Sequence, residues 1–328
     1  MENHPPTAPP APTPAPAPAP APPTATPSAP APPTEAVRPE WAGIDRLPTL
    51  GLLRLMNAED RTVAEAVGGR LAEIAAVVDA VAERMDRGGR LVYAGAGTAG
   101  RLGVLDASEC PPTFATAPGQ VVGLLAGGAP ALVSAVEGAE DRPELAAADL
   151  AALALTPADS VVGVSASGRT PYTVAAVRQA RAAGALTVGL ACNRGSALVA
   201  AADLGIEVEV GPEVVAGSTR LKAGTAQKLV LNLISTAVMV RLGKTYGNLM
   251  VDVRAGNDKL RDRARRIVAE ATGADDATVR SALAATDGRA KDAILVVLAD
   301  VDAPEAGRLL AASAGRLREA LESVGRQA

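Results

Sequence analysis

The chain has 328 residues, of which 48% are apolar and 21% charged, and its net charge is −4 at pH 7. This length allows two ordinary domains with a sizeable core, and the even mixing of acidic and basic residues argues against a nucleic-acid-binding protein. The only histidine is His4, so the folded part is expected to offer no imidazole for catalysis or for binding a metal.

The first 40 residues differ in composition from the rest. They contain sixteen of the 26 prolines, and proline alternates with alanine through APTPAPAPAPAPP. Such a repeat predicts an extended, polyproline-like segment, so residues 1–40 are assigned to a disordered tail. The segment lacks the cationic start and apolar core of a secretory signal, and no apolar run in the sequence is long enough to span a bilayer.

The two cysteines, Cys110 and Cys192, have neither CxxC spacing nor a histidine partner. They are interpreted as reduced, buried thiols near strand ends, which is typical of a cytoplasmic protein. We therefore expect a cytoplasmic protein that does not bind a membrane.

After the tail, residues 41–88 are expected to be mostly helical. Apolar residues recur at helical spacing from Val63 to Met85, and the polar residues 57–62 read as a break before this run. Asn57 is expected to be the N-cap of the second helix, because its side-chain oxygen can accept a hydrogen bond from the first turn.

From residue 90 onward the pattern changes to strands that alternate with helices. Five near-continuous apolar runs are expected to be strands, at residues 90–96, 120–126, 160–165, 186–192 and 205–210. Helices are expected between them, at residues 101–108, 129–141, 143–155, 171–183 and 196–202. Apolar strands joined by helices predict an α/β fold with a parallel sheet covered on both faces. Ligands of such sheets bind beyond the carboxyl ends of the strands.

The C-terminal third is expected to be helical. Residues 219–242 read as one long helix that is apolar around much of its surface and therefore buried, and a short apolar stretch follows it at residues 249–253. Four amphipathic helices are then expected, at residues 261–271, 276–285, 290–298 and 304–321, with turns at Gly273 and Gly288. We assign residues 41–256 to one α/β domain with N-terminal helices, and residues 257–328 to a small helical domain.

The first candidate site is the glycine turn, residues 95–100, which follows the first strand as GxGxxG. A helix that starts at such a turn offers free N–H groups and the positive end of its dipole, so Gly97 and Thr98 are expected to bind phosphate. The acidic residue that a dinucleotide-binding fold carries about 20 positions later is missing, and no Lys-Ser/Thr pair follows as in a P-loop. A tight turn without a ligand is the alternative.

The second candidate is the serine turn, SASGRT, which follows the third expected strand. Its polar members Ser165, Ser167 and Thr170, together with Gly168, precede Pro171, which suits the first turn of a helix. Three hydroxyls and the N–H groups of a helix start suit a phosphate monoester. An ordinary capped turn is the alternative, but two such turns at neighbouring strand ends favour a phosphate site.

A third candidate precedes the long helix, in GPEVVAGSTRLK. Glu213, Ser218, Thr219 and Lys222 place hydroxyls and charges at the start of this helix. A capped helix with solvated charges is the alternative. Together, the three turns are expected to hold one phosphate and a polar body.

A fourth candidate is acidic. EGAED, at residues 137–141, is expected to end a helix, where acids oppose the helix dipole and therefore suggest a function. A solvated helix end is the alternative. A carboxylate near a sugar phosphate can act as a base, and Glu109 is the candidate for a complementary acid.

These segments resemble, in order and spacing, the N-acetylmuramic acid 6-phosphate etherases, which are lyases of the sugar isomerase (SIS) fold. The similarity runs from about Ile44 to the C-terminus. The segments that carry it are GAGTAGRLGVLDASECPPTF, AVEGAED, SASGRTPY, GPEVVAGSTRLKAGTAQKLVLN and GNLMVDV.

The resemblance implies a flavodoxin-like three-layer sandwich with a five-stranded parallel sheet, in which residues 41–256 bind a sugar phosphate and carry catalysis, plus a small C-terminal helical bundle. It implies cleavage of the D-lactyl ether of N-acetylmuramic acid 6-phosphate to N-acetylglucosamine 6-phosphate and D-lactate in cell-wall recycling. It further implies no metal or other cofactor, and a homodimer in which the neighbouring subunit forms part of each site.

Residue roles follow from the same resemblance. Glu109 matches the general acid of the family, and Glu140 matches the residue that removes the proton at C2. The phosphate is expected among the hydroxyls of the serine turn and at the glycine turn. Ala99 stands where the family usually has serine, so phosphate binding is expected to be weaker at most. The segment at residues 34–45 matches the family only loosely.

An acid at position 109 needs a pKa above that of an ordinary glutamate, because a carboxyl group that is ionised at neutral pH has no proton to donate. Desolvation beside Cys110, or the like charge of Asp106 three residues earlier, is expected to supply the increase.

Two other functions of the same fold stay open from the residues alone. An aldose–ketose isomerase would share the phosphate turns and an enolate step, but it needs no acid for a leaving group. A non-catalytic sugar-phosphate regulator would bind the same ligand without using the two glutamates.

Overall fold

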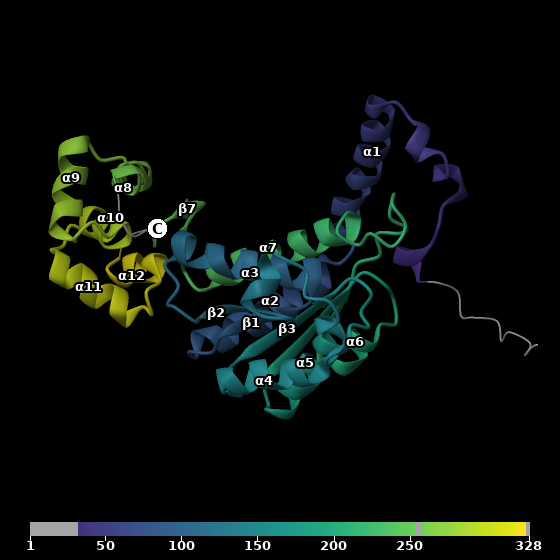
Figure 1. Cartoon of the computed structure of the whole chain (residues 1–328). Coiled ribbons are helices and arrows are strands. Elements are labelled where there is room, and N and C mark those ends of the chain that lie inside the picture. The colour runs from purple at the N-terminus through teal and green to yellow at the C-terminus, as the bar shows by residue number, and fades with distance from the viewer. Residues whose placement is uncertain (1–31, 253–257, 326–328) are drawn as a thin grey trace, which may run out of the picture. The chain divides into compact units, whose positions relative to one another are not determined.

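The computed structural model describes residues 32–252 and 258–325 (Figure 1). The Pro/Ala repeat and His4 lie outside the described residues. The assignment of residues 32–40 to the tail was wrong, because the folded unit begins at Pro32. Short 3-10 turns lie at Pro33–Glu35 and Pro39–Trp41. Proline suits the first position of a helical turn, so composition alone did not separate these turns from the repeat.

The five expected strands form one parallel sheet, which confirms the α/β fold. The strands are β1 Leu91–Gly95, β2 Val121–Leu125, β3 Ser160–Ser165, β4 Leu186–Ala191 and β5 Leu204–Glu207. Their order is β2-β1-β3-β4-β5, and each neighbouring pair is parallel. The chain passes from β1 to β2 on one side of β1 and then crosses to β3 on the other side. The crevice beyond β1 and β3 is therefore the topological switch point at which ligands of this fold bind.

Helices cover both faces of the sheet, so the three-layer sandwich is confirmed (Figure 1). The helices are α1 Thr49–Gly68, α2 Leu71–Asp86, α3 Gly97–Phe114, α4 Pro143–Leu153, α5 Pro171–Ala182, α6 Ala197–Ala201 and α7 Lys222–Arg241. Along β1, Leu91 and Tyr93 pack in the core with α2, α3 and α7, whereas Val92 and Ala94 pack in a second core with α4 and α5. This alternation follows from the two-residue period of a strand.

Of the helices within the described residues, α7 is the one long and apolar enough to cross a membrane. More than half of it is buried, however, and Val230, Ile234 and Val238 are fully buried in the core. The helix therefore packs as the central helix of one layer, as its apolar circumference predicts.

Two helix boundaries were predicted wrongly. Asn57 is not an N-cap, because α1 runs through it, and the break lies at Gly69–Arg70 instead. Only Val63 and Val67 of α1 are buried, so polar residues can occupy its middle without ending it. Helix α3 also continues through Pro111 and Pro112 to Phe114. A proline in the last turn loses one donor but keeps its carbonyl as an acceptor.

The expected helix at residues 129–141 is absent from the described structure. Two 3-10 turns, Ala129–Leu132 and Ala139–Asp141, stand in its place. Gly138, within the expected helix, has a φ of +73°, which interrupts a right-handed helix. The acidic cluster therefore does not end this helix, and the prediction that its carboxylates oppose a helix dipole was wrong.

The C-terminal segments match the expected helices closely. A short hairpin of β6 Thr245–Tyr246 and β7 Leu249–Met250 precedes them. The helices are α8 Asp258–Thr272, α9 Asp276–Ala285, α10 Ala290–Ala299, α11 Ala303–Ala312 and α12 Leu317–Ser323. Gly273 and Gly288 have positive φ at the expected turns, and Gly315, also at positive φ, splits the last expected helix in two.

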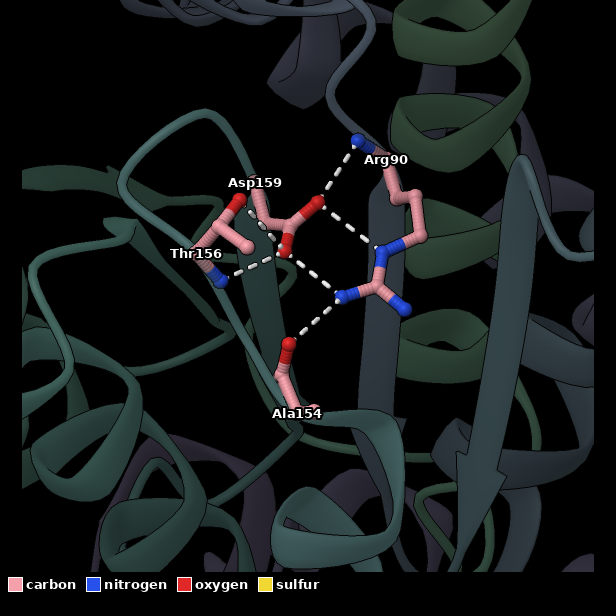
Figure 2. Close-up of polar contacts among 4 residues, drawn as sticks. All are labelled: Arg90, Ala154, Thr156 and Asp159. Carbon is pink, nitrogen blue, oxygen red and sulfur yellow. Dashed lines mark hydrogen bonds and ion pairs between the residues drawn. The ribbon is translucent and has the colours of Figure 1, made fainter.

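The residues immediately before β1 and β3 are joined by an ion pair between Arg90 and Asp159 (Figure 2). Asp159 is buried, and it accepts hydrogen bonds from the backbone N, Nε and Nη2 of Arg90 at 2.9, 3.0 and 2.7 Å and from the backbone N of Thr156 at 2.8 Å. Burial alone would raise the pKa of Asp159, but the hydrogen bonds from Arg90 and Thr156 outweigh it and lower the pKa to about 2. The pair fixes the end of the sheet opposite the ligand crevice.

Candidate active site

A pocket of about 260 Å³ opens beyond the carboxyl ends of β1 and β3, at the switch point of the sheet. It is lined by the start of α3, the turn at Ala139–Asp141, the serine turn, the loop before α7, the second turn of α7 and the turn at Pro33–Glu35. Larger hollows border α5 and other parts of the described structure, but none of the predicted site residues lines them. The predicted chemistry therefore gathers at the smaller pocket.

The start of α3 forms one wall because glycine allows the helix to approach β1 closely. A Cβ atom at Gly100 would lie 2.5 Å from the carbonyl oxygen of Gly95 and 2.5 Å from Cδ1 of Leu125. Gly97 and Thr98 both line the pocket. As residues of the first helical turn, they bring N–H groups without a partner in their own helix, together with the positive end of the dipole, to this wall.

The serine turn forms the opposite wall with three linked hydroxyls. Oγ of Ser165 lies 2.8 Å from Oγ1 of Thr170 and 3.3 Å from Oγ of Ser167, and all three residues line the pocket. Gly168 does not line it, but its N–H donates to Oγ of Ser165 at 3.1 Å. Its φ is +67°, and a Cβ atom there would lie 2.3 Å from Cβ of Ser196. Gly168 thus shapes the turn that presents the hydroxyls.

The structure brings only one of the four predicted residues before α7 to the pocket, namely Thr219. Glu213 is buried and accepts hydrogen bonds from the backbone N–H groups of Lys222 and Ala223, both at 2.9 Å. Such a carboxylate satisfies the free donors of a helix start and stabilises its dipole.

Lys222 is buried as well, and its Nζ lies 2.7 Å from Oε2 of Glu59 on α1. Neither Lys222 nor Ser218 lines the pocket. Glu213, through the backbone of α7, and Lys222, through Glu59, therefore hold α7 in place and do not face this pocket.

The structure brings one of the two predicted catalytic glutamates to the pocket. Glu140 reaches it from the turn at Ala139–Asp141. Glu109 lies twelve residues after Gly97 on α3, about 18 Å along the helix axis, and it does not line the pocket of its own chain. Its side chain is exposed, so the expected desolvation of this carboxyl group is absent within one chain.

Asp106 faces the interior instead of joining Glu109. It accepts hydrogen bonds from the Tyr93 hydroxyl at 2.8 Å, from Nδ2 of Asn232 at 2.7 Å and from the Ser235 hydroxyl at 3.1 Å. Burial raises the pKa of Asp106, and these hydrogen bonds partly offset the increase. Asp106 thus joins α3 to β1 and α7.

Two pocket residues were missed by the sequence analysis. Glu35 reaches the pocket from the N-terminal turn, where the neighbouring Thr34 is fully buried and receives a hydrogen bond from Nδ2 of Asn193 at 3.0 Å. Gln227 lines the pocket from α7. The loose family resemblance at residues 34–45 was a signal for Glu35, and the motif GTAQK contains Gln227. Neither pattern shows which way a side chain points.

The charge of the pocket is unusual for a phosphate site. Its described lining contains the two carboxylates Glu35 and Glu140 but neither lysine nor arginine. Hydroxyls, N–H groups and helix dipoles are therefore the features available to an anion, and these suffice at helix starts.

Neither cysteine is a candidate nucleophile. Cys110 and Cys192 are both buried and free, and burial raises the pKa of each thiol to about 12. Cys192 directly follows β4 as expected, whereas Cys110 lies in α3. Among the described residues, no group of three or more histidine, cysteine or carboxylate side chains is arranged to hold a metal ion.

Comparison with known proteins identifies the family. Residues 73–181 match the glucokinase regulatory protein N-terminal SIS domain, and residues 140–237 match the SIS domain. Among solved structures, a phosphoheptose isomerase from Francisella tularensis is 18% identical, with a TM-score of 0.44, over 57% of this chain and 98% of that chain.

Much closer relatives share nearly the whole sequence. The N-acetylmuramic acid 6-phosphate etherase of Streptomyces coelicolor is 73% identical over 291 residues, which cover 89% of this chain and 94% of the relative. That of Mycolicibacterium smegmatis is 58% identical over 288 residues, which cover 88% and 97%. The chain therefore belongs to the N-acetylmuramic acid 6-phosphate etherase family.

Proposed function

We propose that this member of the etherase family cleaves the D-lactyl ether of N-acetylmuramic acid 6-phosphate in the pocket beyond β1 and β3, giving N-acetylglucosamine 6-phosphate and D-lactate. One observation carries the proposal. The chain is 73% identical to an etherase, and its serine turn, the start of α3 and Glu140 all line the same pocket. The protein is on this reading a carbon–oxygen lyase.

The phosphate binds between the serine turn and the start of α3. Ser165, Ser167 and Thr170 donate their hydroxyl hydrogens, and Gly97 and Thr98 supply the free N–H groups of a helix start. Helix α5 begins directly after the serine turn, so the positive ends of two helix dipoles face the same anion. This arrangement supports tight anchoring without a cation.

The reaction begins from the open-chain sugar, in which the hydrogen on C2 lies next to an aldehyde. Glu140 accepts this proton, the resulting enolate forms a double bond between C2 and C3, and the C3–O bond to lactate breaks. The departing oxygen takes a proton from Glu109. Water then adds its hydroxyl to C3 while C2 regains a proton. Each of these proton transfers is worth about 10²–10⁴-fold in rate.

Glu109 reaches the reaction from a second copy of the chain. In its own chain it lies outside the pocket, and the pocket volume of about 260 Å³ falls below the roughly 300–1,000 Å³ of a complete ligand site. Both facts support a homodimer in which Glu109 of the partner subunit completes the site.

The surface beside Glu109 has the character of an interface. Leu105 lies one helical turn before it and is 50% exposed. Leu132 and Val133 are also exposed, and the turn that precedes them is tied to α3 by a hydrogen bond from Nε of Arg101 to the carbonyl of Ala131 at 2.9 Å. Clustered exposed apolar side chains commonly mark protein–protein contacts.

The direct test is release of D-lactate from N-acetylmuramic acid 6-phosphate by the purified protein. A Glu140→Gln variant serves as the control, because it keeps the size of the side chain but cannot accept the C2 proton. An isomerase would convert a sugar phosphate without releasing lactate, and a regulator would bind without turnover. Either result with the wild-type protein would contradict the proposed function.

We further propose that the protein acts in the cytoplasm and takes part in cell-wall recycling. The two free, buried cysteines support an intracellular compartment, and the substrate is a phosphorylated sugar acid derived from the cell wall.

A further inference from the structure

Gln227 has an unusual position for an amide side chain. It lies in the second turn of α7, only 1% of it is exposed, and it lines the pocket. Its side-chain nitrogen Nε2 is buried without a hydrogen-bond partner among the described residues. A buried donor without a partner destabilises the folded state, so the fold gains nothing from this group.

The surroundings of Gln227 on α7 are apolar. One turn later lie Val230 and Leu231, and one turn earlier lies Ala223, all of them fully buried or nearly so. A leucine or methionine at position 227 would continue this apolar face without leaving a donor unpaired. Packing therefore does not explain why an amide stands here.

The chemistry of the pocket gives the amide a use. Two of the lining side chains, Glu35 and Glu140, are carboxylates, which accept hydrogen bonds when ionised and do not donate them. The hydroxyls of Ser165, Ser167 and Thr170 are linked to one another, and a hydroxyl can rotate, so it has no fixed donor direction. Among the lining residues, Gln227 is the one whose side chain carries N–H donors, and burial restricts its movement.

We propose that Gln227 is a substrate-binding residue of the etherase, whose side-chain N–H donates a hydrogen bond to an acceptor oxygen of the bound sugar phosphate. This inference rests on the proposed function and extends it to a residue that the sequence did not single out. A site that is built to donate a hydrogen bond discriminates strongly against ligands that lack the acceptor, because the donor is then left buried and unpaired.

The test is a Gln227→Leu variant, for which activity and stability should change in opposite directions. Removing an unpaired buried donor should leave the melting temperature unchanged or raise it, whereas losing the bond to substrate should lower kcat/KM by about 10-fold or more. Gln179→Leu is the matched control, because Gln179 is an exposed glutamine on α5 outside this pocket. It should change neither quantity.

A second variant keeps the test valid if leucine disturbs packing. Gln227→Glu retains the shape but replaces the donor with an acceptor, and it should lower kcat/KM further than leucine does. A Gln227→Leu protein that folds and retains wild-type kcat/KM would overturn the inference, since the amide would then serve the fold or bind solvent alone.

Ligand binding separates this inference from the proposed function. N-acetylglucosamine 6-phosphate should raise the melting temperature of the wild-type protein, and it should raise that of Gln227→Leu by a clearly smaller amount. Wild-type protein that binds this sugar phosphate but releases no lactate would contradict the proposed function only. Equal stabilisation of wild type and Gln227→Leu would contradict the role of Gln227 only.

Discussion

Ala99 is a pocket residue at which one added hydroxyl group is expected to change the affinity for the phosphate. It lies in the first turn of α3, is buried and lines the pocket beside Thr98, at a position where the family resemblance implies serine. We predict that Ala99→Ser adds a hydroxyl donor to the phosphate seat and lowers KM by about 2- to 10-fold, because one hydrogen bond contributes about 0.5–1.5 kcal/mol. The value of kcat should change little.

Steady-state kinetics of lactate release measures this effect, with Ala182→Ser on the exposed face of α5 as the control. A KM that is unchanged or raised in Ala99→Ser would show that the backbone donors of α3 already satisfy the phosphate.

Asp159 makes a second prediction, on stability and pH. The folded state lowers its pKa from the usual 3.8 to about 2, so the carboxylate stabilises the fold by about 2 kcal/mol near neutral pH. The depressed pKa means that this contribution is complete above the unfolded pKa and is lost as the pH falls from about 4 through 2. Asp159→Asn should therefore destabilise the protein at pH 7, and the difference from wild type should shrink below pH 4.

Urea unfolding across this pH range measures the difference. Asp79→Asn is the control, because Asp79 forms an exposed pair with Arg241 that should contribute little at any pH. A difference between wild type and Asp159→Asn that does not depend on pH would contradict the assigned ion pair.

Individual side chains also show how far the sequence predicts the site. The serine turn lies at the strand end where it was predicted, because the topology fixes the place of a turn between a strand and a helix that starts with proline. Glu213 and Lys222 were assigned to the pocket because charged residues at a helix start resemble ligand contacts. Their partners are backbone N–H groups and Glu59, which lies 163 residues away from Lys222, and no local pattern reveals such a distant partner.

At the scale of elements, the strands were predicted closely and the connections less well. A central parallel strand is buried on both faces, so its sequence is apolar throughout and easily found. The segment at residues 129–141 has apolar residues in a helix-like arrangement, but Gly138 adopts a left-handed conformation there. The resulting short turn points Glu140 at the pocket, whereas the expected helix would have placed the acids at its end.

The N-terminal turn at Pro33–Glu35 adds a carboxylate to the pocket that the sequence analysis did not predict. Thr34 is fixed by its hydrogen bonds with Asn193, and Glu35 next to it lines the pocket. We predict that Thr34→Val loosens this turn and lowers kcat/KM several-fold through misplacement of Glu35. Glu35→Gln should lower it at least as much, because the amide removes the negative charge and replaces one acceptor oxygen with a donor.

A double-variant cycle checks that the two residues act as one unit. The double variant Thr34→Val, Glu35→Gln should lose no more activity than Glu35→Gln alone. Losses that multiply would show that Thr34 and Glu35 act independently.

At the scale of the whole molecule, the described chain contains two separate kinds of core. The sandwich buries apolar residues on each face of its sheet, whereas α8 to α12 enclose a core of their own, with Val268, Ile294 and Leu295 fully buried. We propose on this basis that residues 257–328 form a helical domain distinct from the etherase domain. A core of its own is the physical requirement for a domain.

The proposed reaction depends on two glutamates that lie far apart in one chain. Glu140 occupies the pocket and Glu109 faces outward from α3, so the proposed reaction needs both residues but takes them from different copies. A single sequence can suggest both glutamates through resemblance to the family. It does not show where the two glutamates lie: α3 is about 27 Å long, its start lines the pocket, and Glu109 lies near its other end.

Co-expression of two inactive variants, Glu109→Gln and Glu140→Gln, tests this arrangement most directly. A mixed dimer with shared sites contains one site with both glutamates intact and one with neither, so random pairing should restore about a quarter of wild-type lactate release. Each variant alone should be nearly inactive. If each site were built within one chain, every site in the mixture would lack one glutamate, and no recovery of activity above the separate variants would contradict the shared site.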